Sequence, residues 1–400
     1  MREKALKVVH ILEAFLGGTA TYACTVLPRL VQRGLDVTLI CSLNRSDPDA
    51  PARIARLKKS GVRVYIVPMS RGIGLFSDIR SFAAILCLLL EQRFDVIHTH
   101  CSKAGALGRV AAALAGGKVT IHSPHCFAFL RCRSPFGKSL YLGVERLLGR
   151  LTTKLVAVSQ SEASAAIRGR IVPDHKCIAI KNGLLDGRFL RKDLPSPHDF
   201  AARQSLGIGR DSDVVTTACR LVGYKGVFRF LQAARLSHAP NATFLLAGDG
   251  DLKVRAEKFI SENGLHDKVK LLGHVSNMER IYAVSDVVVL CSDAEAQPYL
   301  LLEAMRARRP IVATAVIGNT ELISHKKTGL LVEPTPESIA AAIDELLADR
   351  AKRNEYAEKA YVYFRERHTL QEQVSRLTDL YKGCLLNECS RHTSAALGLE

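Results

Sequence analysis

The sequence lacks a long hydrophobic run. Its longest uninterrupted apolar stretch is residues 82–90, far shorter than the roughly 20 residues that a membrane-spanning helix needs. The first 16 residues combine positive charge with apolar side chains, but His10 and Glu13 interrupt the apolar part, so we expect no signal peptide. These absences predict a cytoplasmic protein without a membrane span, either free or peripheral on the inner face of the membrane.

Paired cysteines are also missing. There are 11 cysteines, an odd number, and no Cys-x-x-Cys pair occurs, which argues against a disulfide scaffold and against a structural zinc site. We expect most of the thiols to be small, buried hydrophobic groups in a reducing compartment.

Signatures of common cofactors are absent or misplaced. The fingerprint of three spaced glycines that binds dinucleotides does not follow the first predicted strand, so NAD binding is not supported. Asp47 and Asp49 flank Pro48 in a predicted loop of the basic half, and we do not interpret them as a metal motif. The expectation is a reaction without a cofactor and without a metal.

The first half has few acidic residues. Residues 1–200 contain 30 Lys and Arg but 14 Asp and Glu, a charge of +16, whereas residues 201–400 contain 26 and 25, a charge of +1. A basic half implies an anionic partner, which could be nucleic acid, a phospholipid surface or a phosphate-bearing substrate.

Aromatic and basic residues occur together in part of this half. Phe127, Phe129, Leu130 and Phe136 lie among the cations of residues 131–154, a mixture that suits an anionic membrane surface or nucleic acid. A solvated basic face above a few core aromatic residues is the alternative.

The hydrophobic pattern predicts an α/β protein. Short apolar runs alternate with helical segments, and repeated βα units favour parallel sheets covered by helices on both faces. The polar segment 186–199 is the predicted linker between domains at residues 1–188 and 189–375, with 376–400 as a last helix end and tail. The predicted strands are residues 7–11, 37–41, 62–67, 95–100, 119–123, 155–158 and 177–183, then 214–218, 243–247, 269–272, 287–290 and 311–313.

Residues 292–305 form the most informative stretch. Pro298 fits the first turn of a helix, and free backbone N–H groups near Tyr299 favour a phosphate. Glu295 in the loop and Glu303 in the helix could face one pocket at the carboxyl end of a strand, where open α/β sheets bind ligands. Two carboxylates beside an anion site suit a nucleotide sugar, and two solvated glutamates are the alternative.

Basic and small residues follow other strand ends. Arg220 and, five residues later, Lys225 offer a planar fork and a point charge to phosphates, or else form a structural salt bridge. Gly17 and Gly18 let a ligand approach the backbone at a helix N-terminus, although a tight turn explains them almost equally well.

Polar residues also follow the predicted strands 95–100 and 119–123. His98 and His100 point the same way, but no third ligand is nearby in sequence, so cleft or core polar groups are favoured over a metal site. Ser102 and Lys103 could hold an acceptor phosphate, or could be an N-cap and a solvated lysine. His125 is placed for a cleft.

These motifs resemble the donor-site signature of glycosyltransferase family 4, retaining enzymes of the GT-B fold. In that family two glutamates separated by seven residues are followed by Ala-Met and Pro-Val-Val-Ala-Thr. Here Glu295 and Glu303 precede Ala304-Met305 and Pro-Ile-Val-Ala-Thr at residues 310–314. The resemblance implies two Rossmann-like domains with parallel sheets facing across a deep interdomain cleft, and a last helix that crosses back to the first domain.

The resemblance also implies residue roles. Glu295 would hold hydroxyls of the donor sugar, Glu303 the ribose hydroxyls, and Arg220 with Lys225 the leaving diphosphate. His125 would touch the donor sugar. The implied catalytic residues are Glu295, His125, Arg220 and Lys225. The implied donor-binding residues are Gly18, Arg220, Lys225, His274, Val275, Glu295, Ala296, Gln297, Leu300 and Glu303; the implied acceptor-binding residues are Gly17, Ser102 and Lys103.

The sequence departs from the family pattern at four places. Ala296 replaces a frequent glycine, and Arg308 stands where glycine usually ends the helix. Cys219 replaces the glycine before the arginine, and Ala315 replaces an aspartate upstream of the Gly-x-x-Glu match at residues 318–321.

The expected reaction moves a sugar from a nucleotide-diphosphate donor, UDP first and GDP second, to a hydroxyl of a glycan or lipid-linked acceptor with retention of configuration. The family often builds capsule, lipopolysaccharide or exopolysaccharide. A nucleotide-sugar epimerase is one alternative. A basic nucleic-acid-binding protein is another, although no RNA- or DNA-binding signature occurs, and we expect no nucleic acid as a partner.

Overall fold

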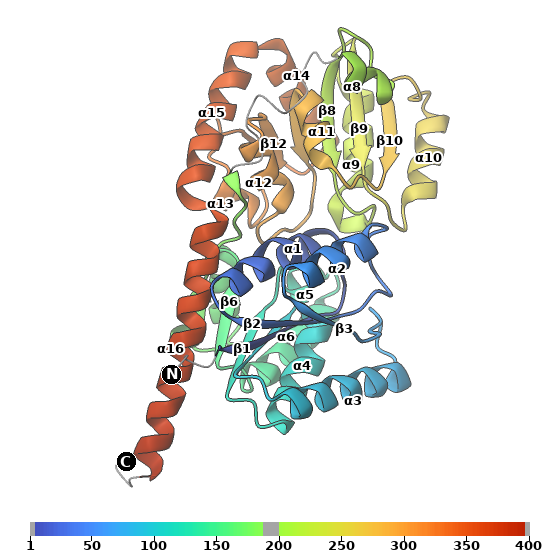
Figure 1. The fold of residues 1–400 in the computed structure, drawn as a ribbon. Coiled ribbons are helices and arrows are strands. Elements are labelled where there is room, and N and C mark those ends of the chain that lie inside the picture. Colours follow the sequence, from blue (N-terminus) through green and yellow to red (C-terminus); the bar gives the residue numbers. More distant parts are fainter. Residues whose placement is uncertain (1–4, 187–199, 397–400) are drawn as a thin grey trace. The chain divides into compact units, whose positions relative to one another are not determined.

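The computed structural model describes residues 5–186 and 200–396 as two compact units (Figure 1). Unit 1 comprises Met1–Asn182 and Leu370–Glu400, and unit 2 comprises Gly183–Thr369. The sequence-based boundary at residues 188/189 differs because Leu184 is buried in the core of unit 2 and donates its backbone N–H to His368 O at 3.0 Å. Most of the predicted linker lies outside the described residues, and the predicted interdomain cleft stays a prediction.

Unit 1 is built on a seven-stranded parallel sheet in the order β3-β2-β1-β4-β5-β6-β7. The central strands are buried on both faces, as a sheet covered by helices requires. The strands are β1 (Lys7–Leu12), β2 (Asp36–Cys41), β3 (Arg63–Ile66), β4 (Val96–His100), β5 (Val119–Ser123), β6 (Lys154–Ala157) and β7 (Cys177–Ala179). The helices are α1 (Gly17–Gln32), α2 (Ala50–Lys59), α3 (Leu75–Gln92), α4 (Ser102–Leu114), α5 (Ala128–Arg131), α6 (Pro135–Gly149), α7 (Gln160–Arg168) and α16 (Leu370–Ala396).

Unit 2 repeats the plan with a six-stranded parallel sheet in the order β10-β9-β8-β11-β12-β13. Its strands are β8 (Asp213–Ala218), β9 (Ala242–Ala247), β10 (Val269–Gly273), β11 (Val287–Leu290), β12 (Ile311–Thr314) and β13 (Leu330–Val332). The helices are α8 (Phe200–Ser205), α9 (Val227–Leu236), α10 (Lys253–Glu262), α11 (Met278–Val284), α12 (Tyr299–Arg306), α13 (Asn319–Leu322), α14 (Pro336–Ala348) and α15 (Arg350–Arg367).

The predicted strands are all present, and the differences lie at element ends. The three-residue strand β13 is too short for its apolar pattern to be recognised. Pro298 has extended backbone (φ −74°, ψ 129°) and precedes α12 rather than lying in its first turn. The predicted helix end and tail at 376–400 belong to α16, which continues to Ala396.

The cysteines are less buried than we expected. The described cysteines are all unpaired, and four of them are buried: Cys41, Cys126, Cys291 and Cys384. Within the described ranges, none of the helices combines the length and hydropathy needed to cross a membrane.

Candidate active site

Two loops meet at the carboxyl edge of the unit 2 sheet, one after β8 and one after β11. Gly226, at φ +70°, lies against the second loop so closely that a Cβ there would be 2.0 Å from Cys291 O. Only glycine permits this approach. It brings the basic segment 220–225 beside the acidic segment 293–295.

Lys225 and Glu295 form the ion pair at the centre of these loops. Lys225 Nζ lies 2.5 Å from Glu295 Oε1, and both side chains are mostly buried. Burial lowers the pKa of Lys225, but the carboxylate of Glu295 raises it, and the net pKa is above the ordinary value. The lysine therefore stays charged. Lys225, which is predicted to bind phosphate, and Glu295, which is predicted to bind the sugar, are therefore in direct contact.

Arg220 and Tyr224 add a second cationic group to the loop after β8. Arg220 Nη2 lies 2.5 Å from Tyr224 OH, and the Tyr224 ring is 5.9 Å from the Arg220 guanidinium and 5.5 Å from Lys225 Nζ. The tyrosine ring therefore orders both cations, since each is attracted to its face.

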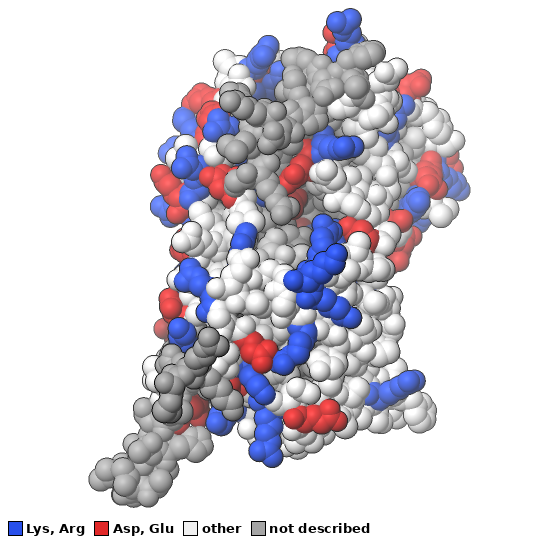
Figure 2. Space-filling view, viewed as in Figure 1, with Lys and Arg blue, Asp and Glu red and all other residues white. Residues whose placement is uncertain are grey.

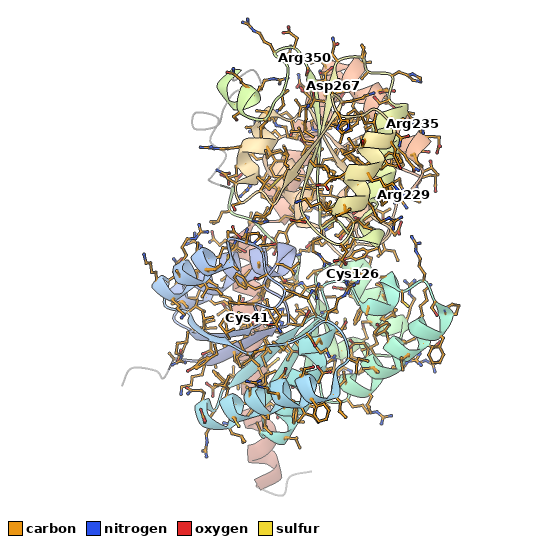
Figure 3. All side chains as sticks on the ribbon, turned by 90° about the vertical axis from the view of Figure 1, so that its right-hand side faces the viewer. Cys41, Cys126, Arg229, Arg235, Asp267 and Arg350 are labelled. Atoms are coloured by element: carbon orange, nitrogen blue, oxygen red, sulfur yellow. The ribbon has the colours of Figure 1, made fainter. Side chains whose placement is uncertain are left out.

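Arg229 was not predicted from the sequence. It projects from α9 (Figure 3), donates to Cys291 O, and pairs with Asp293 Oδ1 at 2.6 Å. It holds the loop that carries Glu295. A single arginine on a helix gives no signal of such a role, because most such residues are solvated.

Glu303 on α12 receives a hydrogen bond from a buried tyrosine. Tyr282 OH donates to Glu303 Oε2 at 2.6 Å. Burial and the neighbouring carboxylate raise the pKa of Tyr282 well above its usual value, so the phenol keeps its proton. The sequence analysis missed Tyr282, because an aromatic residue at helical spacing is usually a core residue.

Other predicted donor-site residues surround these loops. Ala296 and Gln297 are buried, and Gln297 Nε2 lies 3.5 Å from His368 Nδ1. The Leu300 side chain packs in the core, which leaves its backbone for the predicted role. His274 and Val275 follow β10.

Departures from the family pattern are accommodated locally. Arg308 takes the left-handed conformation, φ +53°, that glycine usually supplies at a helix end. Its side chain stacks on Tyr361 at 4.1 Å and pairs with Glu358 at 2.8 Å. The matching Gly318, at φ +90°, contacts the backbone of residues 295–296 at a distance that no Cβ would allow.

The predicted acceptor residues lie at helix starts in unit 1. Gly17, at φ +51°, opens α1, donates its N–H to Asp47 Oδ2 at 2.9 Å, and has open space beside it. Ser102 and Lys103 open α4. Lys103 is not simply solvated, because its Nζ pairs with Asp78 Oδ2 at 2.6 Å.

His98 and His100 on β4 lie beside His10 on β1, and all three are buried. His100 Nδ1 reaches His125 Nε2 at 2.9 Å, so the predicted His125 belongs to the same cluster. The sequence did not reveal His10, which supplies the third nitrogen atom of a set lying within 4.8 Å.

His125 stands on a strained loop. His125 and Cys126 both have left-handed backbone, at φ +49° and +76°, and Cys126 is labelled in Figure 3. The buried Glu162 carboxylate fixes this loop by accepting from Cys126 N at 2.6 Å and Val158 N at 2.9 Å. Strain of this kind persists only where surrounding contacts impose it, and it concentrates at functional sites.

Comparisons with known proteins agree with this architecture. Residues 17–183 match the family described as "Glycosyl transferase 4-like domain", and residues 199–363 match "Glycosyl transferases group 1". The Escherichia coli UDP-Gal:alpha-D-GlcNAc-diphosphoundecaprenol alpha-1,3-galactosyltransferase is 30% identical over 336 residues, covering 82% of this chain and 84% of that protein. The Staphylococcus aureus capsular polysaccharide biosynthesis glycosyltransferase CapM is 23% identical, covering 72% and 77%.

Solved structures share the fold. HepE of Anabaena, in complex with UDP and glucose, superposes with a TM-score of 0.80 at 22% identity, covering 94% of this chain and 100% of that one. WaaG, a glycosyltransferase involved in lipopolysaccharide biosynthesis, gives 0.73 at 17% identity, covering 94% and 100%. The two Rossmann-like units therefore define a glycosyltransferase of the GT-B fold. The chain belongs to glycosyltransferase family 4.

Proposed function

We propose that the protein transfers a sugar from a UDP-sugar to a hydroxyl of a glycan or lipid-linked acceptor, with retention of configuration, in the synthesis of a cell-surface polysaccharide. The observation that carries this proposal is the contact of Lys225 with Glu295 beside Arg220. The E. coli relative uses a UDP-sugar and an acceptor on a lipid diphosphate, and the Anabaena neighbour was solved with UDP and glucose. None of the relatives described above is an epimerase.

In this proposal the site residues position the donor and stabilise charge in the transition state. Arg220 and Lys225 stabilise the charge that develops on the leaving diphosphate, and such preorganised charge is usually the largest catalytic effect. Glu295 accepts hydrogen bonds from hydroxyls of the sugar, and Glu303, oriented by Tyr282, accepts from the ribose. His125 contacts the sugar. We assign no protein nucleophile.

Transfer assays on single variants test this assignment. Labelled UDP-sugars are supplied with a lipid extract, and Glu295→Ala and Lys225→Ala are each expected to lower turnover at least tenfold, or about 1.4 kcal/mol of barrier. Lys253→Ala, which removes an exposed lysine of unit 2, should stay near the wild-type rate. Near wild-type turnover in both site variants would remove the assignment.

The acceptor is reached at an anionic membrane surface, and α6 carries the observation that favours this. Phe136, Leu140, Val144 and Leu147 are exposed at helical spacing, Phe136 at 79%. The one acid among residues 131–154, Glu145, is buried and pairs with Arg109 at 2.8 Å. An exposed apolar face on a segment that also carries exposed cations suits anionic lipid.

The cations and the aromatic residues in and near α6 favour lipid over nucleic acid as the partner of this surface. The exposed cations of residues 131–154 are Arg133, Lys138, Arg146 and Arg150. Figure 2 shows further basic side chains of unit 1, gathered around α2 on the drawn face. Phe127 is buried and stacks on Phe129 at 5.0 Å, so these rings are not available to stack on bases. Phe136 alone among the three phenylalanines of this region is well exposed.

Liposome flotation tests the membrane contact. The protein should float with vesicles that contain anionic lipid and stay behind with neutral vesicles. Leu140→Ser with Leu147→Ser should abolish flotation, whereas Val254→Ser, an exposed apolar residue of unit 2, should not. Equal binding to both vesicles, or no binding, would contradict this part of the proposal, and salt-dependent oligonucleotide binding would favour nucleic acid instead.

A further inference from the structure

Helix α3 of unit 1 carries an exposed apolar face. The exposed small and apolar residues that follow one another at helical spacing along it are Phe76, Ile79, Ala83, Cys87 and Leu90. Phe76 is 88% exposed. The opposite side of the helix, with Ile85 and Leu89, is buried in the core of the unit. An apolar stripe of this length on the outside of a globular protein is typical of an interaction surface.

Helix α4 widens this surface. It packs beside α3 (Figure 1), and its exposed residues are Val110, Ala113 and Leu114. The two charged residues of α4 add no free cation, because Arg109 is buried and Lys103 pairs with Asp78. Within the two helices, the exposed charged residues are therefore Arg80 and Glu91 of α3.

Arg80 and Glu91 are opposite in charge and lie on the same side of the apolar face. Their spacing corresponds to about three helical turns, so the two side chains project in nearly the same direction, about 16 Å apart along the helix axis. They are too far apart to pair with each other, and neither forms an ion pair with another described residue. Each charge is therefore available to a second molecule.

We propose that α3 pairs with α3 of a second copy of this chain in antiparallel orientation, around a two-fold axis at the level of residues 85–86. A two-fold axis brings the same surface of both copies together, so each contact occurs twice. In this register Arg80 faces the partner's Glu91. Ile79 packs against the partner's Leu90, and the small side chain of Ala83 lies near the partner's Cys87 and permits close approach. The pairing does not rest on the proposed function.

The balance of charge favours a second copy over a lipid surface. Helices that lie on anionic membranes are rich in lysine and arginine beside the apolar face, whereas α3 has one exposed cation and one exposed anion. Arg80 and Glu91 complement each other when the helix meets an antiparallel copy of itself. Residues 131–154, which include α6, differ because their exposed charged residues are all positive.

The test exchanges the two charges in the full chain and measures the dissociation constant of the dimer by analytical ultracentrifugation. Arg80→Glu places like charges opposite each other twice, and Glu91→Arg does the same, so each should raise the dissociation constant by about tenfold or more. The double variant restores both pairs and should return the constant to within about threefold of the wild type. Lys58→Glu, which reverses an exposed cation of α2, should leave it unchanged.

Cys87 gives a second readout, because it is exposed and lies close to the proposed two-fold axis. With helix axes about 8 Å apart, the Cα atoms of Cys87 and the partner's Cys87 would be about 6 Å apart, which a disulfide spans. Oxidation with copper–phenanthroline should therefore give a disulfide-linked dimer in the wild type and in Cys132→Ser but not in Cys87→Ser. Ile79→Arg should remove both the dimer and the cross-link, with folding checked by circular dichroism.

A wild type that stays monomeric at about 0.1 mM would overturn the proposal. A double variant that dimerises no more tightly than the two single variants would overturn the antiparallel register. A lipid contact would give a different pattern, since flotation with anionic vesicles would weaken in Arg80→Glu and strengthen in Glu91→Arg. That pattern in a monomeric protein would assign the surface to lipid instead. None of these readouts uses sugar transfer, so their failure is distinguishable from failure of the proposed function.

Discussion

At the scale of single residues, each site carboxylate is held by a proton donor far away in sequence. Glu295 pairs with Lys225, and Glu303 with Tyr282. Hydrogen bonds to charged groups contribute about 1.5–3 kcal/mol, and Tyr282→Phe removes one while keeping the ring. UDP affinity measured by calorimetry should therefore fall about tenfold. Tyr356→Phe is the matched control, and unchanged affinity in Tyr282→Phe would separate Glu303 from the ribose.

Buried histidines make the stability of unit 1 depend on pH. Burial lowers the pKa of His10 to about 3 and that of His125 to about 4, from 6.5 in the unfolded chain. Below pH 6.5 the unfolded chain binds these protons and the folded chain does not. The free energy of unfolding should fall by about 1.4 kcal/mol per pH unit for each such histidine, down to about pH 4. Urea denaturation at pH 7, 6 and 5 measures this slope, and equal midpoints would show that the rings are not buried in the neutral form.

Sequence patterns found the charged residues of the site but not their partners. Glu295, Glu303, Arg220 and Lys225 follow strand ends within a recognisable motif. Tyr282 and His10 lie on a helix and a strand whose patterns are those of ordinary core residues. Their roles depend on which segments the fold brings together, and spacing along the chain does not contain that information.

At the scale of elements, the donor site depends on the close approach of two loops. Gly226→Ala would place a Cβ 2.0 Å from Cys291 O, at a backbone conformation that favours glycine. The loops must then separate, which should lower the melting temperature by several degrees and weaken UDP binding. Gly223→Ala is the matched control, because nothing lies within 4 Å of its added Cβ. Equal effects of the two substitutions would show that the contact does not organise the site.

The presence of a strand or helix was easier to predict than the residues at which it begins and ends. Short apolar runs identified the strands, because both faces of each sheet are covered and most strand residues are buried. The start of α12 and the extent of α16 were not predicted, because capping and packing in the fold decide where a helix begins and ends. The left-handed Arg308 was flagged by the missing glycine, and its contacts with Tyr361 and Glu358 explain how arginine is accommodated there.

At the scale of the whole molecule, chemistry is divided between the two halves of the sequence. Residues 1–200 carry a charge of +16, and residues 201–400 a charge of +1. The cations of unit 2 that we propose to bind phosphate are partly paired with acids, whereas Arg133, Lys138, Arg146 and Arg150 of the α6 segment are exposed. The proposed function therefore places the donor in unit 2 and a membrane-borne acceptor in unit 1.

The measurement that tests the central claim most directly is a thermal-shift titration with UDP, GDP and their sugars. A ligand that binds the folded state raises the melting temperature by mass action. We predict a shift with UDP and UDP-sugars that is lost in Glu303→Ala and in Lys225→Ala but kept in Lys253→Ala. An equal shift in the wild type and the two site variants, or no shift with any nucleotide even when lipid extract is present, would contradict the donor site described here.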